Sequence, residues 1–176
     1  MSYVAVYSVA TSDTPNKVLT HFDDIVATLA EHGVRFERWQ PGPVEKGASD
    51  AELIAACQAQ IDTLGYRAVE VLRDAGDQAQ NAELRGQFLH ERRYSEDDAR
   101  FFLAGQGLFA LHIGDYVYAV RCEKNDLLVI PAGMAHWFDA GEHPHFVALR
   151  LFNTAEGGIP EFTGDDIARR FPGLDD

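Results

Sequence analysis

The sequence predicts a mainly β fold, an antiparallel barrel or sandwich flanked by helices. Short apolar segments rich in Phe, Val, Leu, Ile and Tyr follow one another over residues 88–153, and turn signals separate them. β-branched and aromatic side chains fit the pleated surface of a strand, and short strands at this spacing are typical of barrels and sandwiches. The turn signals lie at residues 104–107, 114–115, 125–126 and 132–133.

The composition is that of one globular domain. The chain has 176 residues, of which 46% are hydrophobic, enough to bury a core. We expect a single domain over residues 1–176, in which elements in residues 1–87 pack on a barrel of residues 88–153. A helix at residues 163–171 should follow. No apolar run is long enough to cross a bilayer, and the N-terminus lacks a signal-peptide pattern.

The charge balance narrows the class of partner. A net charge of −13 repels nucleic acids and anionic membranes. Arginines inside a pocket can still reverse the local field, so a small-molecule substrate that is acidic stays compatible with this surface. Cys57 and Cys122 are too few for a disulfide framework, which favours a cytoplasmic protein. We expect a monomer or a weak homo-oligomer.

The N-terminal third reads as alternating strands and a helix. Residues 3–9 predict a strand, and residues 22–32 predict a helix with one apolar face. Gly33 stands just beyond that helix as a stop signal. Residues 34–39 alternate charged and apolar side chains, as a second strand does, and residues 41–46 read as a loop.

A capping box begins the next helix. Ser49 and Glu52 have the Ser-x-x-Glu spacing in which each side chain bonds the backbone N–H of the other. Apolar residues then recur at helical spacing up to Gly65, where the helix should end. Cys57 lies on the apolar face, and a buried packing role is the interpretation we favour over a reactive thiol.

Four later segments complete the set of predicted elements. Residues 68–72 fit either a strand or a helical turn, and both alternatives stay open. Residues 82–88 predict a short helix, and residues 146–152 predict the last barrel strand. Residues 167–171 predict a terminal helix that ends before Pro172.

Two motifs in the predicted barrel are distinctive. The first, Pro131-x-Gly133-x-x-His136, is a turn followed by a histidine. In the second, Gly105 follows Asp98 seven positions later. These motifs resemble those of the cupins, which implies a double-stranded β-helix or jelly-roll barrel. Closer still, the chain resembles the bacterial acireductone dioxygenases over nearly its full length. The similar segments are residues 33–40, 88–89, 100–102, 111–115, 122–126 and 162–168.

The resemblance implies a metal site whose ligand positions are altered in this chain. The family holds one Fe(II) or Ni(II) with His-x-His, a Glu four residues on, and the histidine of the second motif. The corresponding positions here are Arg92, Tyr94, Asp98 and His136. A guanidinium has no lone pair to offer a metal. Asp98 and His136 are the remaining candidate metal ligands, and the alternative is a site that holds no metal.

Strand alternation groups these residues by face. Arg92 and Tyr94 share one side of a strand, and Asp98 and Arg100 share one side of the next. The resemblance places both faces inside the barrel. We expect an Asp98–Arg100 pair in which the cation keeps the carboxylate ionised. The competing interpretations are a surface edge strand for the first pair and a solvated run of charges for the second.

Candidate roles follow from side-chain chemistry and from the resemblance. The groups suited to acid–base catalysis are Glu91, Tyr94, Asp98 and His136. The groups suited to substrate binding are Arg92, Arg100, Phe88 and Phe138. His143 and His145 form another His-x-His, but no carboxylate adjoins them and a surface turn is favoured. For His112 the favoured interpretation is packing.

Three functions stay open on the sequence. The first is an acireductone dioxygenase-like enzyme of methionine salvage, which cleaves a small enediol with O2 if a metal is retained. The second is a metal-free cupin that performs acid–base chemistry of the isomerase or lyase type. The third is a non-catalytic protein that binds a small molecule in the same pocket.

Overall fold

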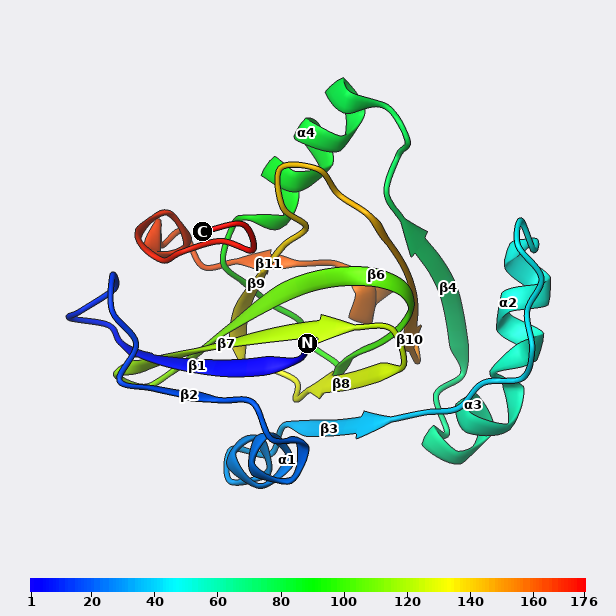
Figure 1. Ribbon diagram of the computed structural model, residues 1–176, viewed down its shortest axis with the longest axis horizontal. Helices are drawn as coiled ribbons and strands as arrows, with labels where there is room; N and C mark the ends of the chain where they lie inside the picture. The colour runs from blue at the N-terminus through cyan, green and yellow to red at the C-terminus, as the bar shows by residue number, and fades with distance from the viewer.

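The computed structural model describes all 176 residues and is built mainly from antiparallel strands (Figure 1). The strands are β1 (Tyr3–Ser8), β2 (Lys17–Leu19), β3 (Arg35–Arg38), β4 (Ala68–Arg73), β5 (Arg92–Arg93), β6 (Asp98–Ile113), β7 (Tyr116–Glu123), β8 (Asp126–Ile130), β9 (Ala135–Asp139), β10 (Phe146–Phe152) and β11 (Glu161–Phe162). The helices are α1 (Phe22–Ala30), α2 (Asp50–Ala56), α3 (Gln58–Leu64) and α4 (Gln78–Phe88), with 3-10 turns η1 (Glu156–Gly158) and η2 (Ile167–Arg170). The predicted mainly β fold with flanking helices is confirmed. None of the helices combines the length and the apolar character needed to span a bilayer.

The strands form two sheets that share β6. In one sheet the order is β11-β5-β9-β6-β7-β1-β2. In the other, β6 pairs with β8 and β10, which in turn pair with β3 and β4. Figure 1 shows β6 as a long curved ribbon that passes from one sheet to the other. The first part of β6 therefore lies in one sheet and its last part in the other.

The turn predicted at residues 104–107 is wrong, because β6 runs through this segment. Gly105 adopts a left-handed φ of 72°, and a Cβ added there would lie 1.8 Å from the His145 carbonyl oxygen. Only glycine tolerates both conditions. Pairing changes from β10 at Gly105 to β7 at Gln106. The glycines thus mark a bend that transfers the strand between sheets, not a chain reversal.

The N-terminal half supplies strands to both sheets. β1 pairs with β7, β3 pairs with β8, and β4 pairs with β10. Of the two alternatives for residues 68–72, the strand is therefore correct. The barrel therefore includes strands from residues 1–87 in addition to the strands predicted in residues 88–153.

The capping box is confirmed, whereas the helix that follows it is divided. The Ser49 hydroxyl accepts a bond from the Glu52 N–H at 3.2 Å, and the Glu52 carboxylate accepts one from the Ser49 N–H at 3.3 Å. Cys57 leaves the helical conformation, with φ −107° and ψ 6°, and separates α2 from α3. Gly65 ends α3 in the left-handed conformation, as predicted. Cys57 is buried, and burial raises the pKa of its thiol to about 11.

The terminal helix is shorter than the predicted one. Only the 3-10 turn η2 forms, and Phe171 after it is extended, with φ −107° and ψ 150°. Pro172 explains the early end, because a proline disfavours the helical conformation of the residue before it.

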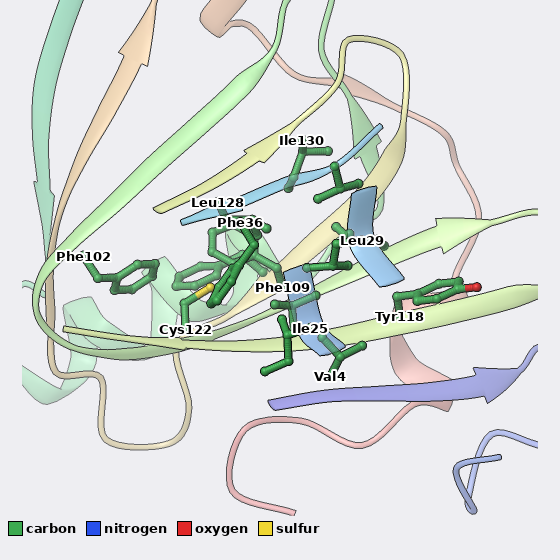
Figure 2. Packing of buried hydrophobic residues seen from close by; sticks show 14 of the residues in the cluster. Val4, Ile25, Leu29, Phe36, Phe102, Phe109, Tyr118, Cys122, Leu128 and Ile130 are labelled. Carbon is green, nitrogen blue, oxygen red and sulfur yellow. The ribbon is translucent and has the colours of Figure 1, made fainter. Parts of the chain in front are cut away.

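The main hydrophobic core lies between the sheets, and α1 closes one side of it (Figure 2). Ile25 and Leu29 of α1 are buried there with Val4, Phe36 and Phe109. Full burial of each such side chain contributes about 1.5–3 kcal/mol to folding. This packing fills the barrel from the end covered by α1 towards its other end.

Helix α4 lies over that other end of the barrel, near the C-terminal segment (Figure 1). Arg85 of α4 donates two bonds to the Asp139 carboxylate, at 2.7 and 3.2 Å. Asp139 also accepts the Leu174 N–H at 2.9 Å. Phe88, the last residue of the helix, packs edge-on against Phe138. The only fully buried residue of α4 is Asn81, and Leu84 and Phe88 pack partly buried against the main core, so few contacts hold the helix in place.

Candidate functional site

Asp98 and His136 meet in the barrel interior. Asp98 begins β6 and His136 lies in β9, and the Asp98 Oδ2 to His136 Nε2 distance is 2.9 Å. Both side chains are almost completely buried. The other ring nitrogen, Nδ1, donates to the Met134 carbonyl oxygen at 2.9 Å. Both nitrogens of the imidazole are therefore engaged by oxygen acceptors.

Two arginines also contact the Asp98 carboxylate. Arg100 Nε donates to Oδ1 at 2.8 Å and Nη2 approaches Oδ2 at 3.4 Å. Arg150 Nε lies 3.7 Å from Oδ1. Burial alone would raise the pKa of Asp98, but Arg100, His136 and Arg150 outweigh it and lower that pKa. Burial likewise opposes the charge of Arg100, yet Asp98 raises the pKa of its guanidinium. Asp98 is consequently a carboxylate with fixed partners.

Arg92 lies directly across from His136, because the two are paired residues of β5 and β9. Its Nε donates to the His90 carbonyl oxygen at 3.1 Å, and Nη2 donates to the Gln87 carbonyl oxygen. The guanidinium also lies over the Phe88 and Phe162 rings, at 5.6 and 4.9 Å from their centroids. No carboxylate lies within ion-pair distance of Arg92, although the residue is only 6% exposed.

Tyr94 completes one wall of the cluster. Its ring centroid lies 5.6 Å from that of His136, and the Arg150 guanidinium stacks over it at 4.9 Å. The side chain is buried. Tyr94 therefore links the Arg150 cation to the imidazole through its aromatic face.

The cluster encloses a cavity of about 10 Å³. A volume this small is about the least that admits one water molecule. Its lining includes seven of the eight predicted site residues, which the structure brings together: Phe88, Arg92, Tyr94, Asp98, Arg100, His136 and Phe138. Phe109 and Trp137 complete the lining. In this conformation the site is closed.

Glu91 is the predicted site residue that the structure places elsewhere. Its carboxylate accepts a bond from Thr163 Oγ1 at 2.7 Å and contacts His112 Nδ1 at 2.8 Å. Neighbouring strand residues point to opposite faces, so Glu91 and Arg92 cannot both enter the interior. Glu91 instead joins the C-terminal segment to β6. His112, predicted to pack, has this carboxylate as a specific partner.

Arg150 is the functional candidate that the sequence reasoning did not include. It lies in β10, paired across the sheet with Arg100. The signal was a single charged residue inside the apolar run of residues 146–152, which is unusual for a strand with a buried face.

Comparison with known proteins identifies the family. The sequence model of the ARD/ARD' family matches residues 4–160. The acireductone dioxygenase of Pseudomonas syringae pv. syringae (strain B728a) is 59% identical, and that of Pseudomonas aeruginosa (strain UCBPP-PA14) is 56% identical, each over 100% of both chains. The chain belongs to the acireductone dioxygenase family. A solved structure of a family member, acireductone dioxygenase from Bacillus anthracis with a cadmium ion in its active center, superimposes with a TM-score of 0.78 at 26% identity. It covers 92% of this chain and 98% of the other, and the cupin-type fold is thereby confirmed.

The residues of this site do not fit the divalent metal that the family implies. Arg92 offers no lone pair, both Asp98 oxygens are engaged by Arg100 and His136, and neither His136 nitrogen is free. Nowhere does the structure gather three His, Cys, Asp or Glu side chains as a metal site requires. Divalent iron and nickel favour imidazole-rich sites. At the positions where the family resemblance implies metal ligands, this chain has an ion-pair network.

Proposed function

We propose that this chain acts in methionine salvage on a small enediol of the acireductone type. The observation that carries the proposal is identity of 56–59% to acireductone dioxygenases over the full length of both chains. The position of the polar cluster within the barrel supports it, since the cluster occupies the ligand positions that the family motif defines.

The residues of the cluster suit recognition of an enediolate. The two neighbouring oxygens of an enediolate accept hydrogen bonds from guanidinium groups, and Arg92 and Arg100 line the cavity. The flat rings of Phe88 and Phe138 favour a planar molecule. His136 and Asp98, joined at 2.9 Å, are an acid–base pair that holds a proton between Nε2 and Oδ2.

A second candidate function is metal-free proton transfer, of the isomerase or lyase type. The Asp98–His136 pair favours it, because the pair provides acid–base chemistry with no additional group. A third, non-catalytic binding, is favoured by the hydrogen bonds that occupy the Asp98 carboxylate and both His136 nitrogens.

One experiment tests these functions together. An enediol of the acireductone type is mixed with the protein as purified and, in parallel, with chelator-treated protein, and loss of the enediol and uptake of O2 are followed side by side. Enediol loss with matching O2 uptake supports dioxygenase action, and enediol loss without O2 uptake supports proton transfer. Binding without turnover leaves the non-catalytic function. Absence of both binding and turnover would overturn the proposal. The matched variants are His136→Gln in the site and His143→Gln in the predicted surface turn.

We also infer the cell compartment and the oligomeric state: a cytoplasmic protein that is a monomer or a weak homo-oligomer. The two cysteines are free and buried, as expected in a reducing compartment. Fractionation and analytical ultracentrifugation test the two parts separately.

A further inference from the structure

The interior site contains more positive than negative charge. Three guanidinium groups, those of Arg92, Arg100 and Arg150, are at most 8% exposed and converge on the cluster. Asp98 is the only carboxylate among the residues that line the cavity. Glu70 contacts Arg150 at 3.5 Å from outside, where its side chain is 45% exposed. The three arginines, set against Asp98 and the partly exposed Glu70, therefore leave the closed site with a surplus of at least one positive charge.

Arg92 is the least compensated of the three. A buried charge is costly unless a counter-ion accompanies it. Arg100 and Arg150 share Asp98, but the partners of Arg92 are two neutral carbonyl oxygens and two aromatic rings. Its third nitrogen, Nη1, has no hydrogen-bond partner among the protein groups. Arg150 Nε is buried and also lacks a hydrogen-bond partner.

We propose that Arg92 serves as a fixed cation in place of the family's divalent metal, and that the site binds a small dioxyanion without any metal. The position supports this, because Arg92 occupies the first ligand position of the family motif and faces His136 across the β5–β9 pair. A guanidinium there repels a divalent cation and attracts an anion. The inference rests on the proposed function for the choice of an enediolate as the natural ligand class.

The free donors define the ligand more closely. Arg92 Nη1 and Arg100 Nη1, on two arginines that line the cavity, have no hydrogen-bond partner among the protein groups, and planar guanidinium groups match pairs of neighbouring oxygens. One or two negative charges would neutralise the surplus. The aromatic faces of the lining, those of Phe88 and Phe138 among them, favour a flat molecule. A planar dianion with adjacent oxygens satisfies all three conditions, and a neutral molecule of the same shape does not.

Ligand entry requires α4 to move. A cavity of about 10 Å³ cannot hold a dioxyanion. One carbonyl partner of Arg92 belongs to Gln87 in the last turn of α4, next to Phe88 in the lining. An anion that takes over Arg92 would release this carbonyl and the helix end together. Binding and displacement of α4 are thus coupled through one guanidinium.

The test uses oxalate as the probe and oxamide as its neutral analogue. Calorimetric titration of chelator-treated protein should detect oxalate and not oxamide. Arg92→Gln should weaken oxalate binding about 10-fold or more, because a charged hydrogen bond is lost. The matched control is Arg93→Gln, whose exposed side chain donates to the Gly133 carbonyl oxygen outside the cluster and should leave affinity unchanged.

Titration of wild-type protein with Ni(II) provides the second measurement and needs no variant to fold. No stoichiometric binding is expected. One tightly bound equivalent of Ni(II), or equal affinity for oxalate and oxamide, would overturn the inference. Arginine-dependent oxalate binding without enediol turnover would leave the inference intact and defeat only the enzymatic forms of the proposed function. Turnover that requires a bound metal would support the enzymatic function and overturn the inference.

Discussion

Asp98 and His136, separated by 38 residues in the chain, are joined by a hydrogen bond of 2.9 Å across the barrel interior. Asp98 is paired with Ile130 in one sheet, whereas His136 is paired with Leu111 in the other. The bond therefore spans both sheets at a point where Arg100 and Arg150 also converge. It makes the Asp98 carboxylate the centre of the whole polar cluster.

Replacement of Asp98 should destabilise the fold in a pH-dependent manner. Asp98→Asn leaves two buried arginines without their carboxylate and should lower the free energy of unfolding at pH 7 by about 3–5 kcal/mol. The folded state lowers the pKa of Asp98, so its charged form stabilises the protein above about pH 4, and this contribution is lost as the pH falls further. Urea unfolding at several pH values should show the two proteins converging below pH 4. Asp115→Asn, in an exposed turn, is the control and should follow the wild type throughout. A constant difference between Asp98→Asn and wild type at all pH values would contradict this account.

The family's metal site should be recoverable. Arg92→His combined with Tyr94→His and Asp98→Glu restores a His-x-His-x-x-x-Glu face opposite His136 and removes a fixed positive charge. The triple variant should bind Fe(II) or Ni(II) far more tightly than the parent, with incomplete activity where outer partners differ. Parallel calorimetric titrations measure this. A folded variant with no gain in metal affinity would show that the surrounding barrel has also diverged.

The anchor of α4 should control opening of the site. Arg85→Ala removes two bonds to Asp139 and leaves that buried carboxylate with backbone donors alone. Hydrogen exchange of amides in residues 78–88 should become faster, while exchange in β6 and β7 stays slow. Glu83→Ala, a substitution on the same helix outside this ion pair, is the control. Equal protection of residues 78–88 in Arg85→Ala and wild type would mean that other contacts hold the helix.

The bend in β6 should not tolerate a side chain. Gly105→Ala combines a left-handed φ of 72° with a contact of 1.8 Å to backbone, which cannot move aside easily. We expect severe destabilisation or loss of folding. Gly133→Ala also has a positive φ, of 83°, but open space around it, and should cost only about 1–2 kcal/mol. Thermal unfolding of both variants separates the cost of the steric clash at Gly105 from the cost of a positive φ, which both positions share. Similar melting temperatures for the two variants would show that the clash contributes little.

Face alternation predicted the main contacts of the site. Asp98 and Arg100 pair as expected from their spacing, and Arg92 and Tyr94 both line the interior. Local spacing is sufficient here because strand geometry fixes which side chains share a face. The same rule, applied to Glu91 beside Arg92, assigns Glu91 to the opposite face, where it meets His112 and Thr163.

Other features depend on contacts that sequence spacing does not contain. The glycines at residues 104–107 have the composition of a turn, and only the partners of β6 reveal a bend. Arg150 enters the site through its register with Arg100, which is a long-range relationship. Closure of the cavity results from packing of Phe88 and Phe138, whose geometry depends on where α4 lies. Contacts of this kind join residues far apart in the chain, and no pattern within a single segment predicts them.

The sharing of β6 between sheets has a consequence for the order of folding. Asp98 at one end of this strand and Leu111, the partner of His136, towards the other belong to different sheets. The charged cluster therefore cannot leave water until both sheets have formed and the strand has bent at Gly105. One sheet alone brings Arg100 and Arg150 to Asp98, and the other sheet supplies His136. Complete desolvation of these charges thus requires both sheets together.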